Sequence, residues 1–437
     1  MHNIDKINMD KVKYRTIALI GFILLLSIFW VAIESIGYFW VMLVPNFFLL
    51  VLTCVFIVGY LSISNEKERL NKNYEPISII VPGYNAGKTL KRCIESIKNA
   101  YYPTKKEIIY VDDGSTDDSV KIAKNMGIKV IEMGKNQGKA KALNTGIKAA
   151  KNEIIACIDS DTYLDKDALI NAVKKFNNKD VGAVAVLIKV ERPDKLIKKF
   201  QDLEYAIGFG LYALIGKYFN IIFVTPGPMT LFKKSVFDKI GLFDENNITE
   251  DLEMGWRLRK YHYKIEYALD AVVYTEVPET VKGLLRQRLR WDRGKLVNLK
   301  KYHYMLFKPK YGDFGTFILP FSLTAEFAAI TVIMATSIIL IKQFFWGLLF
   351  LFYSILSNIG IVIESLPILS SSALYIAIVF MLPFFLVAYL SKKITANNIT
   401  IFDFITIFLA TILYSLFISF AYFLSFFQEL GRADYKW

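Results

Sequence analysis

The hydrophobic pattern divides the chain into three stretches of different character. Residues 16–33 and 41–63 are two almost unbroken apolar runs near the start. Residues 75–310 instead alternate short β-branched runs with amphipathic stretches. Further apolar runs follow at residues 316–341, 344–363, 372–390 and about 401–427. A helix of about 20 apolar residues can cross a hydrocarbon core of roughly 30 Å. The pattern therefore predicts a folded domain inserted between about six transmembrane helices.

The middle stretch has the period expected of alternating strands and helices. Strands are predicted at residues 77–81, 107–111, 128–132 and 153–158. Helices are predicted between them at residues 88–99, 117–126 and 138–151. This alternation predicts an α/β domain of right-handed βαβ units, with a mostly parallel sheet and helices on both faces. In such sheets ligands bind beyond the carboxyl ends of the strands.

The basic residues beside the apolar runs predict an orientation in the membrane. Residues 1–15 and 64–72 are rich in Lys and Arg, whereas residues 34–40 contain neither. By the positive-inside rule both outer ends of the first two runs are cytoplasmic. Residues 1–70 are thus expected to be a cytoplasmic segment with two transmembrane helices, and residues 75–310 a cytoplasmic domain. Residues 311–437 are expected to form four more transmembrane helices and a short cytoplasmic tail. Lys392 and Lys393 do not fit this count of transmembrane helices, because it would place them on the outer side of the membrane.

Composition supports a multi-pass protein of the cell membrane. Hydrophobic residues make up 54% and aromatic residues 15% of the chain, above the usual globular share. Lys and Arg number 53 against 40 acidic residues, a net charge of +13. Such an excess suits the anionic lipids of a cytoplasmic leaflet. A nucleic-acid partner is not expected, because the basic residues flank the apolar runs and the sequence shows no nucleic-acid recognition motif.

Polar clusters directly follow several of the predicted strands. Pro82 and Tyr84 follow the first, the pair Asp112-Asp113 the second, and Asp159-Ser160-Asp161 the fourth. Two carboxylates two residues apart at the end of a strand can reach the same side. They offer oxygen ligands to Mg²⁺ or Mn²⁺, which keeps positions open for substrate phosphates. Acidic residues here can also simply form turns, but their placement on one rim favours a site.

Two predicted helices begin with residues suited to catalysis. Lys139 opens one, and a helix N-terminus with a lysine suits phosphate. Glu250 and Asp251 open another; a carboxylate there can act as a general base, although the helix macrodipole alone favours acids in a first turn.

The stretch Gln287–Trp291 combines an amide, a guanidinium and an indole. On a helix Gln287, Arg290 and Trp291 share one face, and that trio can meet a sugar ring and a phosphate. Arg288 lies on another face and receives no such role. A basic amphipathic helix resting on a membrane would look similar.

With these motifs in order, the chain resembles the family 2 glycosyltransferases over about residues 75–295. Within them it is similar to the processive membrane synthases of hyaluronan, poly-N-acetylglucosamine, chitin and cellulose. The resemblance implies a GT-A fold and inverting transfer from a nucleotide sugar, usually UDP-linked, to a growing β-linked polysaccharide, coupled to its translocation across the membrane. It also implies interfacial helices near residues 200–218 and 280–302, for which helices of the domain core are the alternative.

The resemblance implies a role for each motif residue. Those expected to bind the nucleotide sugar are Pro82, Tyr84, Asp112, Asp113, Lys139 and Asp159. Asp161, with Asp159, is expected to hold the divalent cation, and Asp251 to deprotonate the acceptor hydroxyl. Gln287, Arg290 and Trp291 would hold the acceptor end and the diphosphate. A single transfer to a membrane lipid, and a non-catalytic transporter or scaffold, remain the alternatives.

Overall fold

The computed structural model describes residues 51, 53–54, 57, 74–215, 222–357, 382, 385–395 and 400–431. The chain divides into two compact units. One comprises Gly59–Pro320 with Leu390–Thr406, and contains the sheet. The other comprises Met1–Val58, Phe321–Tyr389 and Ile407–Trp437.

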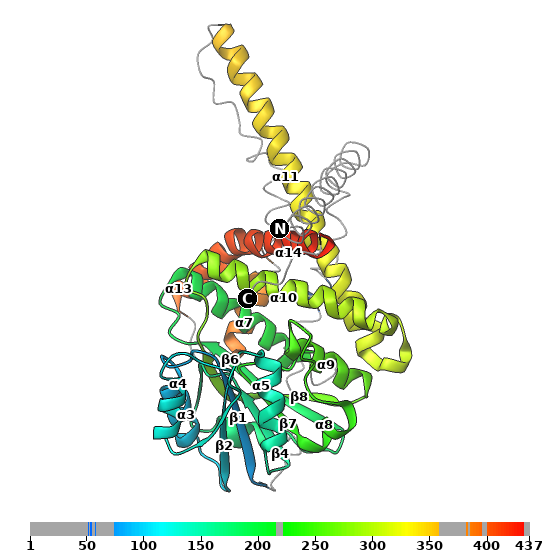
Figure 1. The fold of residues 1–437 in the computed structure, drawn as a ribbon. Coiled ribbons are helices and arrows are strands. Elements are labelled where there is room, and N and C mark those ends of the chain that lie inside the picture. The colour runs from blue at the N-terminus through cyan, green and yellow to red at the C-terminus, as the bar shows by residue number, and fades with distance from the viewer. Residues whose placement is uncertain are drawn as a thin grey trace, which may run out of the picture. The chain divides into compact units, whose positions relative to one another are not determined.

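The first unit is built on one eight-stranded sheet, with the order β3-β2-β1-β4-β7-β6-β8-β5 (Figure 1). The strands are β1 (Ile77–Gly83), β2 (Lys106–Asp112), β3 (Lys129–Glu132), β4 (Ile154–Ile158), β5 (Thr162–Leu164), β6 (Val181–Val190), β7 (Met229–Lys233) and β8 (Lys264–Thr275). The four strands predicted from the sequence are β1 to β4, and all four are confirmed.

The mostly parallel sheet is confirmed for only part of these strands. Parallel pairing joins β3, β2, β1 and β4, and also joins β6 to β8. The pairs β4/β7, β7/β6 and β8/β5 are antiparallel, so the sheet is mixed. β5 follows β4 after only three residues but pairs with the later strand β8, at the other end of the strand order. β7 is almost entirely buried, and an apolar strand of that kind carries no sign of its direction.

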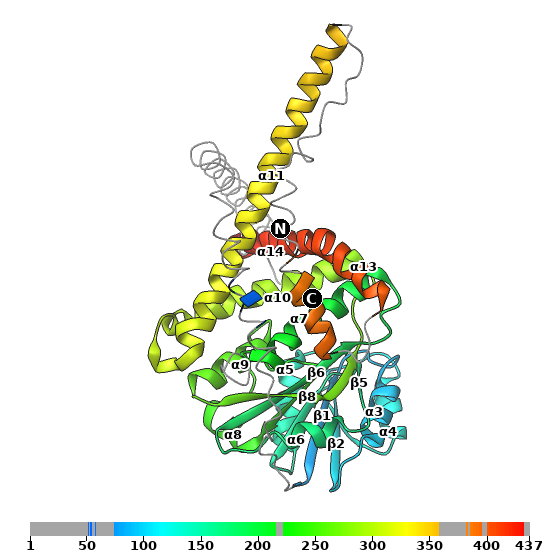
Figure 2. The ribbon, with the colours of Figure 1, turned by 180° about the vertical axis from the view of Figure 1, so that it is seen from behind.

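Helices cover both faces of the sheet, as predicted. The three predicted between the first strands are α3 (Leu90–Asn99), α4 (Ser119–Asn125) and α5 (Lys139–Ala149). The crossovers through α3 and α4 move along the sheet in one direction and the crossover through α5 returns in the other (Figure 2). Right-handed crossovers therefore place α5 on the opposite face from α3 and α4. Shorter helices, α6 (Ala168–Val173) and α8 (Lys234–Ile240), complete these layers.

Both of the longer predicted helices of this unit are present. α7 (Leu196–Ile215) lies against β6 and β8, and Phe209 stacks on Tyr267 of β8 with centroids 5.9 Å apart. α7 therefore covers the sheet along one side. α10 (Val281–Tyr302) begins at Thr280, whose side chain accepts the N–H of Gly283 at 3.1 Å. The interfacial role of the two helices stays a prediction.

α10 is fixed against α9 (Glu250–Lys260) by a close approach and by hydrogen bonds. A Cβ on Gly294 of α10 would lie 2.3 Å from the side chain of Thr249, so only glycine permits this approach. Further along α10, Asn298 donates to the Thr249 hydroxyl at 3.1 Å. Tyr302 donates to Glu253 at 2.6 Å. The start of α9 is thereby held in place by α10.

The predicted membrane spans are only partly covered by the described residues. Runs 16–33 and 41–63 lie outside them apart from residues 51, 53, 54 and 57, as does most of run 372–390. Runs 316–341 and 344–363 were expected as separate helices, but most of the described part of both forms one continuous helix, α11 (Leu319–Leu356). Nothing at positions 342 and 343 breaks it, because Lys and Gln are good helix formers.

The last predicted run is also helical. Residues 401–430 form α13 (Ile401–Leu409), a π-helical turn (Ala410–Tyr414) and α14 (Ser415–Leu430). Among the residues that the structure describes, no helix has both the length and the apolar character that crossing a membrane requires.

Candidate active site

The predicted rim of polar residues is present at one edge of the sheet. In the register of β1 and β2, Pro82 lies beside Val111 and Gly83 beside Asp112. β4 pairs with the other side of β1 and runs parallel to it. The residues that follow these three strands therefore meet at the same edge.

On this rim, Asp112 and Asp113 bind backbone N–H groups. Asp112 accepts the N–H groups of Gly114 and Ser115 at 3.1 and 3.0 Å. Asp113 accepts those of Gln137 and Gly138, 2.7 and 2.9 Å away. Asp113 thus ties the loop after β2 to the loop that opens α5. Because its carboxylate occupies the N–H groups just before α5, a phosphate there would rely on the side chain of Lys139.

Pro82 and Tyr84 differ in their accessibility. Pro82 is buried within β1, whereas Tyr84, just beyond the strand, is 50% exposed. Of the two, Tyr84 is the side chain that a base could stack on.

Lys139 lies at the centre of a cluster of carboxylates. Its Nζ is 2.5 Å from Oδ1 of Asp159 and 3.6 Å from Oε1 of Glu250. Burial lowers the pKa of Lys139, but the carboxylates of Asp159, Glu250 and Asp251 outweigh burial and raise that pKa above its ordinary value. A Cβ on Gly227 would lie 2.7 Å from the Lys139 Nζ and 2.9 Å from Asp159. The loop around Gly227, which is flanked by Pro226 and Pro228, therefore passes directly over this ion pair.

Asp161 lies beside Asp159, and the positive charge near them is too small to balance both carboxylates. Desolvation and the charge of Asp159 raise the pKa of Asp161 to about 7, although Lys139 acts in the opposite direction. Glu276 contributes further negative charge, and its N–H donates to the carbonyl of Asp161 at 3.3 Å. A cation placed here would relieve this repulsion.

The two aspartates fit the divalent cation that the sequence resemblance implies. Oxygen ligands suit Mg²⁺ and Mn²⁺, which are commonly held by one or two carboxylates together with substrate phosphates and water. Within the described ranges no group of three or more His, Cys, Asp or Glu side chains is arranged to hold a metal alone. The pair is therefore suited to a cation that arrives with a nucleotide.

The start of α9 brings a buried carboxylate next to the predicted base. Glu250 is only 5% exposed, and desolvation together with the charge of Asp251 raises its pKa despite Lys139. The carbonyl of Asp251 accepts the N–H and the hydroxyl of Thr225 at 3.2 and 2.7 Å. The segment after Thr225, which includes Gly227, is thus anchored to the same helical turn as Asp251.

Arg290 of α10 extends to this cluster. Its positive charge interacts electrostatically with Glu250 and with Tyr205 of α7. Tyr205 also interacts electrostatically with Asp161. Gln287, one turn away, has a buried Oε1 without a hydrogen-bond partner in the described part of the chain. Arg290 therefore acts electrostatically on the acidic cluster, and Gln287 has capacity for a ligand.

The ring of Trp291 lies against an arginine of the same helix. Arg288 was assigned to another face without a role, yet its Cζ lies 4.1 Å from the centroid of the Trp291 ring. The reason is that residues three apart on a helix are neighbours as well as residues four apart.

Sequence reasoning assigned no separate role to Glu250 and missed Tyr205. Glu250 is adjacent in sequence to Asp251, and that adjacency was a usable signal. No sequence signal indicated Tyr205, because its electrostatic interaction with Asp161 arises from the packing of α7.

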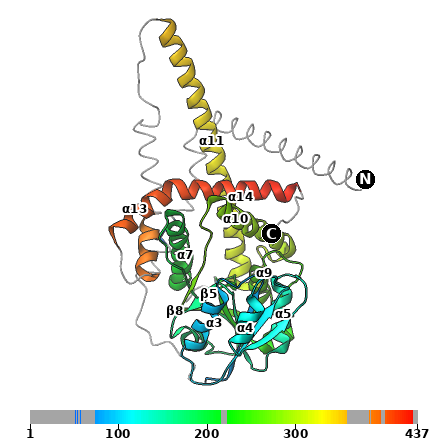
Figure 3. The same ribbon diagram turned by 60° about the vertical axis from the view of Figure 1, so that its left-hand side comes forward.

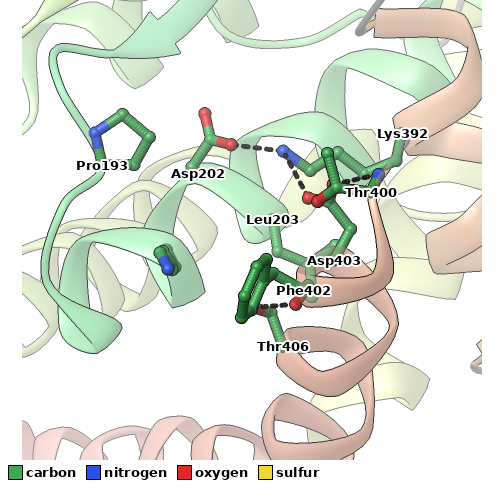
Figure 4. A pocket seen from close by; sticks show the side chains of 9 residues that line it. Pro193, Asp202, Leu203, Lys392, Thr400, Phe402, Asp403 and Thr406 are labelled. Carbon is green, nitrogen blue, oxygen red and sulfur yellow. Dashed lines mark hydrogen bonds and ion pairs between the residues drawn. The ribbon is translucent and has the colours of Figure 1, made fainter. Parts of the chain in front are cut away.

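A separate cavity of about 230 Å³ lies between α7 and residues 392–406 (Figure 4). Its lining residues are Pro193, Lys199, Asp202, Leu203, Lys392, Thr400, Phe402, Asp403 and Thr406. None of the predicted site residues is among them, so this cavity is not the candidate active site.

Comparison with known proteins finds glycosyltransferases. A family model described as Glycosyl transferase family 2 matches residues 78–241. The poly-β-1,6-N-acetyl-D-glucosamine synthase of Staphylococcus epidermidis is 36% identical over 229 residues, which cover 51% of this chain and 55% of that protein. The synthase of Staphylococcus aureus strain COL is 33% identical over 263 residues, covering 59% and 63%. The chain thus matches less than two thirds of the length of these relatives.

A solved structure shows the same fold. The mannosyltransferase PcManGT from Pyrobaculum calidifontis, in complex with GDP-Man and Mn²⁺, has a TM-score of 0.53 and 19% identity. The match covers 85% of this chain and 99% of that one. The mixed sheet fits the expected GT-A type of fold. Together these matches identify residues 78–241 as a glycosyltransferase domain of family 2, in a chain homologous to poly-β-1,6-N-acetyl-D-glucosamine synthases.

Proposed function

We propose that this protein transfers N-acetylglucosamine from a UDP-linked donor to the end of a growing β-linked polysaccharide. The observation that carries the proposal is the charged cluster of Lys139, Asp159 and Asp161 inside the glycosyltransferase domain, joined by Glu250 from just beyond it. The choice of sugar and of a polymeric acceptor follows the names of the staphylococcal relatives. A decayed, non-catalytic scaffold is disfavoured, because Asp159, Asp161 and Asp251 are all retained.

The cluster is suited to bind a nucleotide diphosphate and to stabilise it as a leaving group. Asp159 and Asp161 would hold a divalent cation, which when bound offsets the charge of the diphosphate. Lys139 and Arg290 add positive charge at the same place, where the bond between the anomeric carbon and the diphosphate breaks. Their charge favours departure of the nucleotide with the bonding electron pair.

Asp251 is the proposed general base. The acceptor hydroxyl gives its proton to the Asp251 carboxylate while its oxygen forms the new bond to the anomeric carbon. Attack from the side opposite the diphosphate converts an α-linked donor into a β-linked product. Gln287 and Trp291 hold the acceptor sugar, the indole by stacking and the amide by hydrogen bonding.

We further propose that residues 390–406 lie on the same side of a membrane as the catalytic domain. Lys392 pairs with Asp202 of α7 at 2.5 Å and with Asp403 at 3.6 Å (Figure 4). Figure 3 shows the ribbons of α7 and α13 next to each other. A Cβ on Gly210 of α7 would lie 2.9 Å from that of Ser391. A segment packed this closely on the domain cannot lie across a bilayer from it. Lys392 would then lie on the cytoplasmic side with the catalytic domain and obey the positive-inside rule.

This topology predicts the accessibility of position 400. A cysteine replacing the exposed Thr400, in a Cys54→Ser background, should react with an impermeant maleimide only in inside-out vesicles. Labelling in right-side-out cells would refute the arrangement.

The proposed activity is tested by a donor screen followed by sizing of the product. Purified protein in membranes receives labelled UDP-N-acetylglucosamine, UDP-glucose, UDP-glucuronate or GDP-mannose, with Mg²⁺ or Mn²⁺. We expect a high-molecular-weight product from UDP-N-acetylglucosamine. A lipid carrying one added sugar would instead support the single-transfer alternative and refute the polymer.

A further inference from the structure

The two arginines on either side of Leu289 have different surroundings. Arg290 acts on Glu250, whereas Arg288 is only 2% exposed. The guanidinium carbon of Arg288 lies 4.1 Å from the centroid of the Trp291 ring. The indole therefore rests against a buried, planar cation.

The cation beneath Trp291 is held from a second helix. Nη2 of Arg288 lies 2.6 Å from Oε2 of Glu204, which belongs to α7. α7 is itself fixed to the segment that leads into α10, because Gln201 donates to the carbonyl of Pro278 at 2.8 Å. Lys198 also lies 3.5 Å from Glu279. Glu204 thus holds the guanidinium from a helix that cannot readily shift relative to the start of α10.

This geometry needs an arginine. A guanidinium can stack its flat face on an aromatic ring while its edge donates to a carboxylate, whereas a lysine ammonium cannot do both. A cation removed from water also attracts an indole face more strongly than an exposed one. Stacking on one face fixes the plane of the indole and leaves its other face for a ligand.

We propose that Arg288, held by Glu204, is a positioning residue that fixes the Trp291 indole for stacking on the acceptor sugar. The inference rests on the proposed function, in which Trp291 holds the acceptor. Arg288 touches neither donor nor acceptor in this account. Its loss should therefore slow transfer while the binding and slow hydrolysis of the donor persist.

The test is a double-mutant cycle between Arg288→Lys and Trp291→Ala. Arg288→Lys keeps a positive charge near Glu204 but loses the planar stack. We expect transfer to fall about 10–100-fold, as small misplacements of a binding group do, with donor hydrolysis within about twofold of wild type. In the Trp291→Ala background the same change should have no further effect, since a residue acting through another is not additive with it. Losses that multiply would overturn the proposal.

An exchange of charges separates positioning from simple attachment of the two helices. The double variant Glu204→Arg/Arg288→Glu restores an ion pair between α7 and α10 but places no cation under Trp291. We expect thermal stability to recover and transfer to stay low; recovery of transfer would refute the positioning role. If the exchanged protein fails to fold, the Arg288→Lys cycle decides.

Two controls complete the experiment. Arg286→Lys makes the same change at an exposed position of the same helix and should leave transfer unchanged. A wild-type protein inactive with every donor would refute the proposed function itself. An active wild type with a multiplicative cycle would refute only the role of Arg288.

Discussion

Two groups of carboxylates at one sheet edge show how this domain uses the same side chain for two tasks. Asp112 and Asp113 each accept two backbone N–H groups of the neighbouring loops. Asp159 and Asp161 instead lie beside each other and beside Lys139. The first pair shapes the rim, and the second holds charge that a ligand can balance.

The difference has a physical basis. A carboxylate that accepts several N–H groups is stabilised in its charged form without any ligand. A desolvated carboxylate next to another is destabilised, which is why the pKa of Asp161 rises to about 7. Strain of this kind is typical of a functional site. Substitutions in the two groups should therefore act on different properties, catalysis in one and stability in the other.

The largest effect is expected at the base beside the charged cluster. Asp251→Asn should lower transfer about 10²–10⁴-fold, the range that general-base catalysis contributes, while nucleotide affinity stays near that of wild type. Initial rates and calorimetric titration with UDP would measure the two. Asp238→Asn, at an exposed position on α8, is the matched control. Undiminished turnover in Asp251→Asn would remove the residue from the base role.

A smaller loss of activity is expected from substitution of Asp161, which lies beside Asp159. Asp161→Asn should reduce transfer about 10²–10³-fold, because a bound cation contributes several kcal/mol to stabilising developing charge. Raising the Mn²⁺ concentration should restore part of the rate if weakened metal binding is the cause. Asp113→Asn serves as the comparison, and an equal dependence on Mn²⁺ in both variants would erase the distinction between the two pairs.

For Asp113→Asn the main effect should be on stability. The carboxylate accepts two N–H groups, and an asparagine can accept only one while turning its own N–H₂ toward the other. Hydrogen bonds to charged groups contribute about 1.5–3 kcal/mol each, so a fall in Tm of about 5 °C or more is expected. An unchanged Tm would show that the loop before α5 does not depend on this carboxylate.

The smallest expected effect is a pH-dependent gain in the stability of the Asp161→Asn variant. Because the pKa of Asp161 is raised from 3.8 to about 7 in the folded protein, the folded state binds its proton more tightly than the unfolded state. The metal-free protein should therefore lose stability as pH rises from about 4 to 7. Asp161→Asn removes this loss, so its Tm should exceed that of wild type by a few degrees at pH 8 and by less at pH 5. The opposite trend would mean that Asp161 is stabilised as an anion.

The sequence was sufficient for features that depend on local pattern. The alternation of apolar runs predicted β1 to β4 with their helices, and the polar residues after those strands predicted the rim. Helical spacing predicted α10 and its Gln287, Arg290 and Trp291.

Features that depend on distant partners could not be predicted. Asp113 binds amides 24 residues away, and Arg288 pairs with Glu204 at a separation of 84 residues. No local pattern records either contact. The antiparallel direction of β7 could not be predicted either, because the apolar pattern of a strand buried on both faces does not depend on its direction.

The claim that Asp159 and Asp161 hold the metal-bound nucleotide is tested most directly by calorimetry. UDP would be titrated into wild type, Asp161→Asn and Asp113→Asn, each with and without Mn²⁺. We predict that Mn²⁺ raises UDP affinity at least about tenfold in wild type and Asp113→Asn, as it must if the metal adds about 1.4 kcal/mol or more to binding. In Asp161→Asn, Mn²⁺ should have almost no effect. The same gain from Mn²⁺ in all three proteins would contradict the account.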